Sequence, residues 1–306
     1  MLNKNPIFIV SFAYGGSNIL LNLLRSHPEV CSPRGELNEV FKGRREEPSS
    51  TRLAKKLRYF PCVIAEGRDV FGFNDWEPRR PFKVFTHRIV DRILFDEKLR
   101  AINPSQNFYK YEDAKYTKEE IKISRLLSKN LDGLTFVTPE LARMYPDAVF
   151  FGLVRNGFAI CEGHARRGYD LETIAKNYEK GCLLMLEHSQ AISNYHIVRY
   201  EDMIASPLET LKKIYRLAGL DIAQVKKIRL QDKRVVEKDG SHPVVHQAEW
   251  KKMIWYDLDE LDKHFRRDAN ENQIRRLTEE QKSLILKHCS ASLEKFGYLP
   301  AGAKIL

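Results

Sequence analysis

Residues 6–26 read PIFIVSFAYGGSNILLNLLRS. The apolar run from Ile7 to Phe12 predicts a buried β-strand, and the two glycines that follow predict a tight turn. From Ser17 to Ser26 leucines recur on one side of a helical pattern, which predicts an α-helix. A strand, a glycine turn and a helix in this order are typical of the opening unit of an α/β fold.

Further strands and helices alternate along the chain. The clearest strand is Ala148 to Val154, and the segment Leu126 to Lys129 is ambiguous between a short strand and the end of a helix. The alternation predicts an α/β protein whose mostly parallel central sheet is covered by helices on both faces. The other expected strands are Phe82–Thr86 and Tyr195–Arg199, and the expected helices are Leu171–Ile192, Pro207–Leu217 and Thr278–Phe296.

The chain has 306 residues and contains no internal repeat and no long Pro/Ser/Gly linker. We therefore expect a single domain over residues 1–306. Residues 42–80 and 229–270 resist assignment and are rich in charged side chains, and we expect residues 42–120 and 229–270 to be excursions on the substrate side. Such excursions carry substrate contacts in many enzymes, but solvated surface insertions explain them equally well.

The composition limits the partners and the compartment. A formal net charge of +10 favours anionic partners, yet it is spread along the chain, so we expect no nucleic acid as a partner. No apolar run approaches the roughly 20 residues of a membrane helix. The five scattered cysteines form no CxxC pair, which favours the reducing cytoplasm and argues against a structural metal site.

Two segments have the pattern of anion sites. Gly15 and Gly16 let the backbone turn tightly and aim several N–H groups at one point, where the following helix N-terminus adds partial positive charge and Ser17 adds a hydroxyl. The turn lacks the Lys of GxxxxGK[ST], which excludes a standard kinase or GTPase. Arg155 follows a buried strand, where open α/β sheets bind ligands. An ordinary strand-to-helix turn and a structural ion pair are the alternatives.

Three segments together resemble the sulfotransferase family that uses 3′-phosphoadenosine 5′-phosphosulfate (PAPS). The segment PIFIVSFAYGGSNILLNLLRSHPEV resembles its 5′-phosphosulfate loop, and YPDAVFFGLVRNGFAICEGHARRG resembles its 3′-phosphate strand and helix. YHIVRYEDMIASPLETLKKIYRLAGL resembles the strand and Tyr-Glu-Asp turn that follow. The resemblance implies a P-loop-like, three-layer α/β/α fold of the branch that includes tyrosylprotein sulfotransferases and bacterial enzymes.

Family roles transfer to individual positions. The resemblance implies that Glu36, in Gly35-Glu36, is the catalytic base and that Lys129, in SKNLDG, acts at the reaction centre. Two positions depart from the family pattern: Tyr14 replaces the usual Arg or Lys, and Gly163 replaces the usual Ser. The implied nucleotide-binding residues are Tyr14, Gly15, Gly16, Ser17, Asn18, Arg155, Gly163, Arg167, Tyr200 and Ser241.

The implied reaction is transfer of a sulfuryl group from PAPS to a hydroxyl or amine, with PAP, the desulfated nucleotide, as product and no metal. The sequence leaves open whether the acceptor is a carbohydrate, lipid, peptide or small molecule, and it leaves the oligomeric state open. A PAP- or PAPS-binding protein without turnover and a polyanion-binding protein are the alternatives.

Several residues have competing interpretations. His87, in KVFTH at the end of an expected strand, is the rival base with Lys83 beside it, although a partly buried structural His is the more ordinary reading. His27 is expected to be a packing residue at a helix end. Glu36 also has a structural alternative, an ion pair with Arg34 or Arg44.

Overall fold

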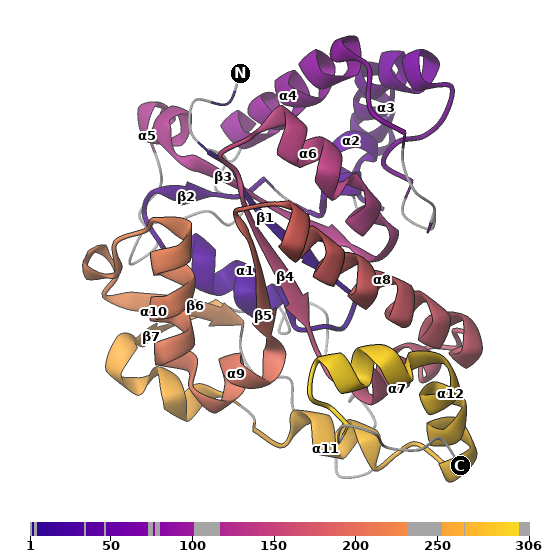
Figure 1. Ribbon diagram of the computed structural model, residues 1–306. Coiled ribbons are helices and arrows are strands. Elements are labelled where there is room, and N and C mark those ends of the chain that lie inside the picture. Colours follow the sequence, from indigo (N-terminus) through magenta and orange to yellow (C-terminus); the bar gives the residue numbers. More distant parts are fainter. Residues whose placement is uncertain are drawn as a thin grey trace.

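The computed structural model describes residues 2, 5–33, 35–45, 47–72, 76, 80–100, 117–231, 253–265 and 267–299. A five-stranded parallel sheet lies at the centre, in the order β2-β3-β1-β4-β5 (Figure 1). Every residue of β1, β3 and β4 is buried, as expected for strands covered on both faces. The strands are β1 (Ile7–Ser11), β2 (Val30–Cys31), β3 (Arg125–Leu131), β4 (Val149–Val154) and β5 (Tyr195–Arg199).

Helices cover both faces of the sheet, so the fold has three layers, α/β/α. One face of β1 presents Ile7 and Ile9 to a core shared with α1 (Ser17–Arg25), α9 (Tyr200–Ala205) and α10 (Pro207–Ala218). The opposite face presents Phe8 and Val10 to the second core. That core is shared with α2 (Leu37–Lys42), α3 (Ser49–Glu66), α4 (Val84–Leu99), α6 (Thr138–Met144), α7 (Gly157–Ala165), α8 (Leu171–Ala191) and α12 (Glu279–Lys295).

The remaining described elements lie outside the sheet. They comprise the short helices α5 (Lys118–Ile123) and α11 (Ala269–Ile274) and three 3₁₀ segments, Asp132–Val137, Ile222–Gln224 and Leu258–His264. β6 (Lys227–Gln231) pairs antiparallel with β7 (Met253–Asp257) in a separate two-stranded sheet. In the described part of the chain, no helix combines the length and the apolar character that a membrane span requires.

The expected α/β class, the parallel sheet and the three layers are confirmed. The ambiguous segment at Leu126 to Lys129 is a strand, the centre of β3. The strand expected at Phe82 to Thr86 is wrong, because Val84 begins α4. Buried residues in α4 recur at positions 86, 90, 93, 94 and 97, a helical spacing that a five-residue window cannot reveal.

Candidate active site

The turn after β1 is built on backbone conformations that need small or tolerant residues. Gly16 has φ +87°, and a Cβ there would lie 2.3 Å from the ring of Tyr200. A Cβ at Gly15 would lie 2.9 Å from the carbonyl oxygen of Phe12. Tyr14 also has a left-handed conformation, with φ +62°. The turn ends at Gly16, and α1 begins at the next residue, Ser17.

Three expected site residues from different segments meet at this turn. The ammonium of Lys129, on β3, donates a hydrogen bond of 2.9 Å to the amide oxygen of Asn18 on α1. The same ammonium lies 3.2 Å from a carboxylate oxygen of Glu36, the residue that precedes α2. Glu36 retains 25% side-chain exposure, whereas Lys129 retains 9%. The carboxylate is thus reachable from solvent, with a cation fixed behind it.

Glu36 is positioned by its own helix. The N–H of Glu36 donates 2.9 Å to the carboxylate of Glu39, and the two residues form a capping box at the start of α2. Arg44 lies 3.4 Å from Glu39 and so supports the cap from the other side. Lys129 is thus an ion-pair partner of Glu36, and Glu39 is an ion-pair partner of Arg44. Arg34, the other partner considered for Glu36, lies outside the described residues.

Asp132 is a site residue that the sequence analysis missed. It follows β3 with φ +51°, is 8% exposed, and accepts a 3.0 Å hydrogen bond from the N–H of Ala13 in the turn. Burial is the main reason that its pKa is raised to about 6, and the nearby Glu36 raises it further while Lys129 lowers it. The Asp-Gly pair after a strand was the available signal, but nothing local links it to residue 13.

Arg155 lies at the carboxyl end of β4, as expected, and it already has several partners. It donates 2.8 Å to the backbone oxygen of Tyr14 and 2.8 Å to the amide oxygen of Asn270, and it also donates to Gln273. Its guanidinium lies 4.3 Å above the ring centre of Tyr200. Asn270 and Gln273 belong to α11, which sequence patterns did not reveal. These contacts join the turn, β4 and α11 at a buried cation.

The two departures from the family pattern touch each other. A Cβ at Gly163 would lie 3.3 Å from the Cβ of Tyr14, so a residue without a side chain at 163 leaves room for the tyrosine. The guanidinium of Arg167 lies 3.9 Å over the Tyr14 ring, a cation–π contact. The His164 ring packs edge-on to Tyr14, and burial lowers its pKa to about 4, so it is neutral near pH 7. Arg167 therefore places a positive charge on the ring of Tyr14, and Arg155 places one at its backbone oxygen.

His87 and His27 lie in other environments. His87 is on α4, not at a strand end, and its ring lies 3.6 Å from the buried carboxylate of Glu140 on α6. His27 is fully buried, contacts the backbone oxygen of Asp221 at 3.1 Å and packs against Tyr215, so its expected packing role is confirmed. Ser241 lies outside the described residues. Within the described ranges, no three His, Cys, Asp or Glu side chains form a metal-binding group.

Comparison with known proteins decides the family. A model of the sulfotransferase family matches residues 6–224, most of the chain and both strand-end sites. The chain belongs to the sulfotransferase family. A second model, of the sulfotransferase domain, matches residues 171–297 of this sulfotransferase. The protein is accordingly a transferase enzyme, as expected. None of the curated proteins matches it.

Two solved structures share the fold of this sulfotransferase. The sulfotransferase domain from the Synechococcus PCC 7002 olefin synthase is 17% identical, with a TM-score of 0.50 over 97% of this chain and 98% of that chain. The sulfotransferase domain from the curacin biosynthetic pathway is 15% identical, with a TM-score of 0.53 over 98% of this chain and 100% of that chain. At these identities the likeness is one of fold.

Proposed function

We propose that this sulfotransferase transfers the sulfuryl group of PAPS to a hydroxyl or amine acceptor by in-line displacement. The observation that carries the proposal is the position of the Lys129 ammonium, between Asn18 of the turn and the carboxylate of Glu36. It joins a cation, a hydrogen-bonding loop and a partly exposed base at one point. Displacements of this type depend on positioning and charge stabilisation more than on covalent work by the protein.

Glu36 is proposed as the general base and Lys129 as the electrostatic group. The Glu36 carboxylate accepts the proton of the acceptor's hydroxyl or amine. The Lys129 ammonium stabilises negative charge that develops at the reaction centre. Bound PAPS would supply the electrophilic sulfur and a phosphate leaving group. The capping box with Glu39 keeps the carboxylate of Glu36 directed toward Lys129.

The nucleotide is proposed to lie along the carboxyl ends of β1 and β4. The N–H groups of Gly16 and Ser17 and the side chain of Asn18 suit a 5′-phosphosulfate at a helix N-terminus, while the N–H of Gly15 closes the turn by donating 3.1 Å to the backbone oxygen of Phe12. Arg155 and Arg167 are proposed for the 3′-phosphate, with Tyr200 beside the nucleotide, Gly163 giving space and Ser241 in a covering loop. Three of the five N–H donors of Arg155 are used by partners among the described residues, which leaves two for a phosphate.

The proposal includes the domain organisation, the acceptor class and the cellular compartment. Residues 1–306 form one domain in this proposal. The acceptor is a carbohydrate, a lipid, a peptide or a small molecule. All five cysteines are free and buried, which supports a reducing compartment such as the cytoplasm.

PAP binding tests the cofactor. PAP at 100 times its dissociation constant should stabilise the fold by roughly 2.7 kcal/mol, measured as a thermal shift. Arg155→Ala should weaken PAP far more than AMP, because a charge-assisted contact of this kind contributes roughly 1.5–3 kcal/mol. No shift with PAP would refute the cofactor, and equal losses for both nucleotides would assign Arg155 a structural role.

Turnover of Glu36→Gln tests the base. The substitution keeps the shape and removes the basicity, so PAP affinity should stay nearly intact while transfer falls by roughly 10²–10⁴. His87→Asn is the matched control, since His87 contacts Glu140 and not Lys129. If His87→Asn abolishes transfer and Glu36→Gln does not, the assignment of Glu36 is wrong.

A further inference from the structure

Exposed apolar side chains concentrate at α3 and the start of α4. Ten large hydrophobic residues are exposed among the described residues, and six of them lie there. Such clustering differs from the scattered exposed apolar residues of ordinary surfaces and marks an interaction site. We name these six the apolar ridge: Leu53, Leu57, Phe60, Ile64, Val84 and Phe85, each between 54% and 67% exposed.

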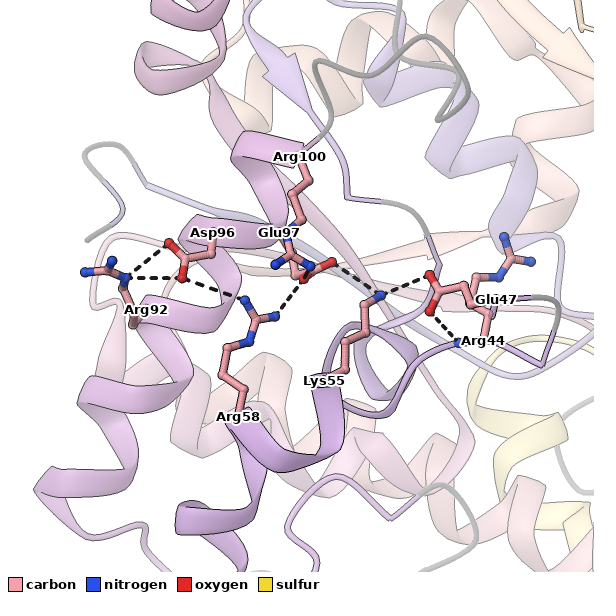
Figure 2. Close-up of polar contacts among 8 residues, drawn as sticks. All are labelled: Arg44, Glu47, Lys55, Arg58, Arg92, Asp96, Glu97 and Arg100. Carbon is pink, nitrogen blue, oxygen red and sulfur yellow. Dashed lines mark hydrogen bonds and ion pairs between the residues drawn. The ribbon is translucent and has the colours of Figure 1, made fainter. Parts of the chain in front are cut away.

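Helix α3 carries apolar side chains on the side that faces solvent. Its apolar residues at 53, 57, 60 and 64 follow a spacing of three or four and form one stripe. The opposite side of the helix holds Lys55, Tyr59 and Cys62, all buried. Figure 2 shows Lys55 and Arg58 directed from α3 toward Glu97 of α4. The buried side of α3 therefore serves the fold, with Tyr59 and Cys62 in the core and Lys55 in ion pairs, whereas the apolar stripe stays exposed.

The two parts of the apolar ridge belong to one surface. Lys83, the residue before α4, donates through its ammonium to the backbone oxygen of Ala65 at 2.5 Å and through its N–H to Glu66 at 2.8 Å. These bonds fix Val84 and Phe85 beside the last turn of α3. Figure 1 shows α3 and α4 together at one end of the molecule.

The surroundings of the apolar ridge are basic. Helix α3 contains four basic residues and one acidic residue, the terminal Glu66; two of the basic residues, Lys55 and Arg58, form ion pairs with carboxylates of the fold. Lys56 is exposed beside the stripe, and Arg88 follows Val84 by one turn on the exposed side of α4. Arg92, one turn further, pairs with Asp96. An apolar stripe flanked by exposed basic residues is the pattern of helices that lie in the interface of an anionic bilayer.

We propose that the apolar ridge docks this enzyme on the surface of an anionic lipid bilayer. The apolar side chains enter the boundary between headgroups and acyl chains, and the flanking Lys and Arg side chains contact lipid phosphates. A second copy of the chain is disfavoured as the occupant, because both copies would bring basic residues and a net charge of +10 to the contact. The inference stands independently of the proposed reaction.

A single fluorescent label tests the contact directly. All five native cysteines are buried, so Leu57→Cys offers one accessible thiol for an environment-sensitive dye. Vesicles of phosphatidylcholine with roughly 30% phosphatidylserine should shift its emission to the blue, and pure phosphatidylcholine should do so far less. The matched control is Ile123→Cys, 60% exposed on α5 and outside the apolar ridge, which should show no shift.

Vesicle co-sedimentation of the unlabelled full chain then separates the contribution of the apolar side chains to lipid binding from that of the basic side chains. Leu57→Ser with Ile64→Ser should weaken partition by at least about tenfold, and Ile123→Ser should leave it unchanged. Lys56→Glu with Arg88→Glu should abolish the preference for phosphatidylserine, whereas Lys213→Glu on α10 should not. Melting temperatures of all variants check that they fold.

Three results would overturn the proposal. Wild-type protein that stays in the supernatant with every vesicle, or partition equally reduced by Ile123→Ser, would exclude a specific bilayer contact. A blue shift at Leu57→Cys that grows with protein concentration in the absence of lipid would assign the surface to a second copy. A shift produced by poly-glutamate as strongly as by vesicles would assign it to an acidic protein.

Discussion

The side chain at position 14 changes how charge is arranged around the turn. Tyr14 brings no positive charge to the turn, because a phenol has no cationic form. The guanidinium of Arg167 lies over the ring of Tyr14 and donates 2.6 Å to the backbone oxygen of Gly163. These contacts hold the charge of Arg167 at the Tyr14 ring. Arg155 donates to the backbone oxygen of Tyr14, and Lys129 donates to Asn18 and lies beside Glu36. In the proposed mechanism, Lys129 is therefore the cation at the reaction centre.

Lys129→Ala should lower kcat far more than it lowers nucleotide affinity, because its interaction strengthens as charge develops in the transition state. Tyr14→Phe is the comparison: it keeps the ring under Arg167 and removes only the hydroxyl, so its effect on kcat should be milder. Steady-state kinetics and PAP titration measure both. A larger loss of kcat in Tyr14→Phe than in Lys129→Ala would contradict the role of Lys129.

Asp132 makes stability depend on pH. Its pKa is about 6 in the folded protein and 3.8 as an ordinary carboxyl, so between these values the folded state binds more protons than the unfolded state. The free energy of unfolding that Asp132 contributes must therefore fall as pH rises through this window. Asp132→Asn keeps an oxygen for the N–H of Ala13 and removes the charge.

Asp132→Asn should be more stable than wild type at pH 7 to 8, by at most on the order of 3 kcal/mol, and the difference should vanish below about pH 4. Urea unfolding of both proteins across this range measures it. A difference that is independent of pH, or a variant that is less stable at pH 8, would show that Asp132 is ionised without cost in the folded protein.

At the scale of elements, a charged network joins α3 to α4 (Figure 2). Lys55 is 5% exposed and lies 3.0 Å from Glu47 and 3.4 Å from Glu97. Glu97 also pairs with Arg58 at 2.6 Å and with Arg100 at 2.9 Å. Asp96 extends the network to Arg92 at 3.1 Å. The two helices are thus joined by the buried pair of Lys55 and Glu97, which more exposed arginines surround, with Tyr59 and Cys62 packed in the neighbouring core.

Glu97→Gln should destabilise the protein by about 3 kcal/mol, because it leaves Lys55 and Arg58 near the interior with fewer compensating charges. Glu209→Gln is the control: its partner Lys212 is 48% exposed, and exposed pairs contribute less than about 1 kcal/mol. Free energies of unfolding in urea measure both. If both variants lose the same free energy of unfolding, the buried ion pairs of Glu97 contribute no more to stability than an exposed pair does.

Across the whole molecule, the two cores share one sheet. β1 contributes Phe8 to one core and Ile9 to the other, and α12 packs along α8 on the same side as Phe8. Trp76 stacks on Phe12 at a centroid distance of 6.3 Å and meets Phe136 edge-on at 6.5 Å. Because the same strands contribute to both cores, we expect the two cores to unfold together.

Urea unfolding should therefore give a single transition, with the same midpoint by far-ultraviolet circular dichroism and by tryptophan fluorescence. Trp76 lies in the core of Phe8, whereas Trp255 of β7 lies 5.6 Å from the guanidinium of Arg229 on β6. Fluorescence thus reports on two parts of the chain. Two separated midpoints would contradict a single domain and would divide the chain into independently folding units.

Local patterns were sufficient for three of the central strands and four helices. The strand, turn and helix at residues 6–26, the strands at Ala148 and Tyr195 and the long helix from Leu171 follow from hydrophobic periodicity and glycine placement. The resemblance added Glu36 and Lys129, which the structure brings together. These features were predictable because each is encoded within one element or one continuous motif.

The tertiary structure alone decided the contacts between distant segments. Asp132 meets Ala13 across 119 positions, and Asn270 meets Arg155 across 115, and neither pairing has a local pattern. Likewise, only the packing of α7 against the turn shows that Gly163 leaves room for the side chain of Tyr14. Sequence periodicity reports which face of an element is apolar, whereas the packing of the elements determines which polar residues meet at their ends.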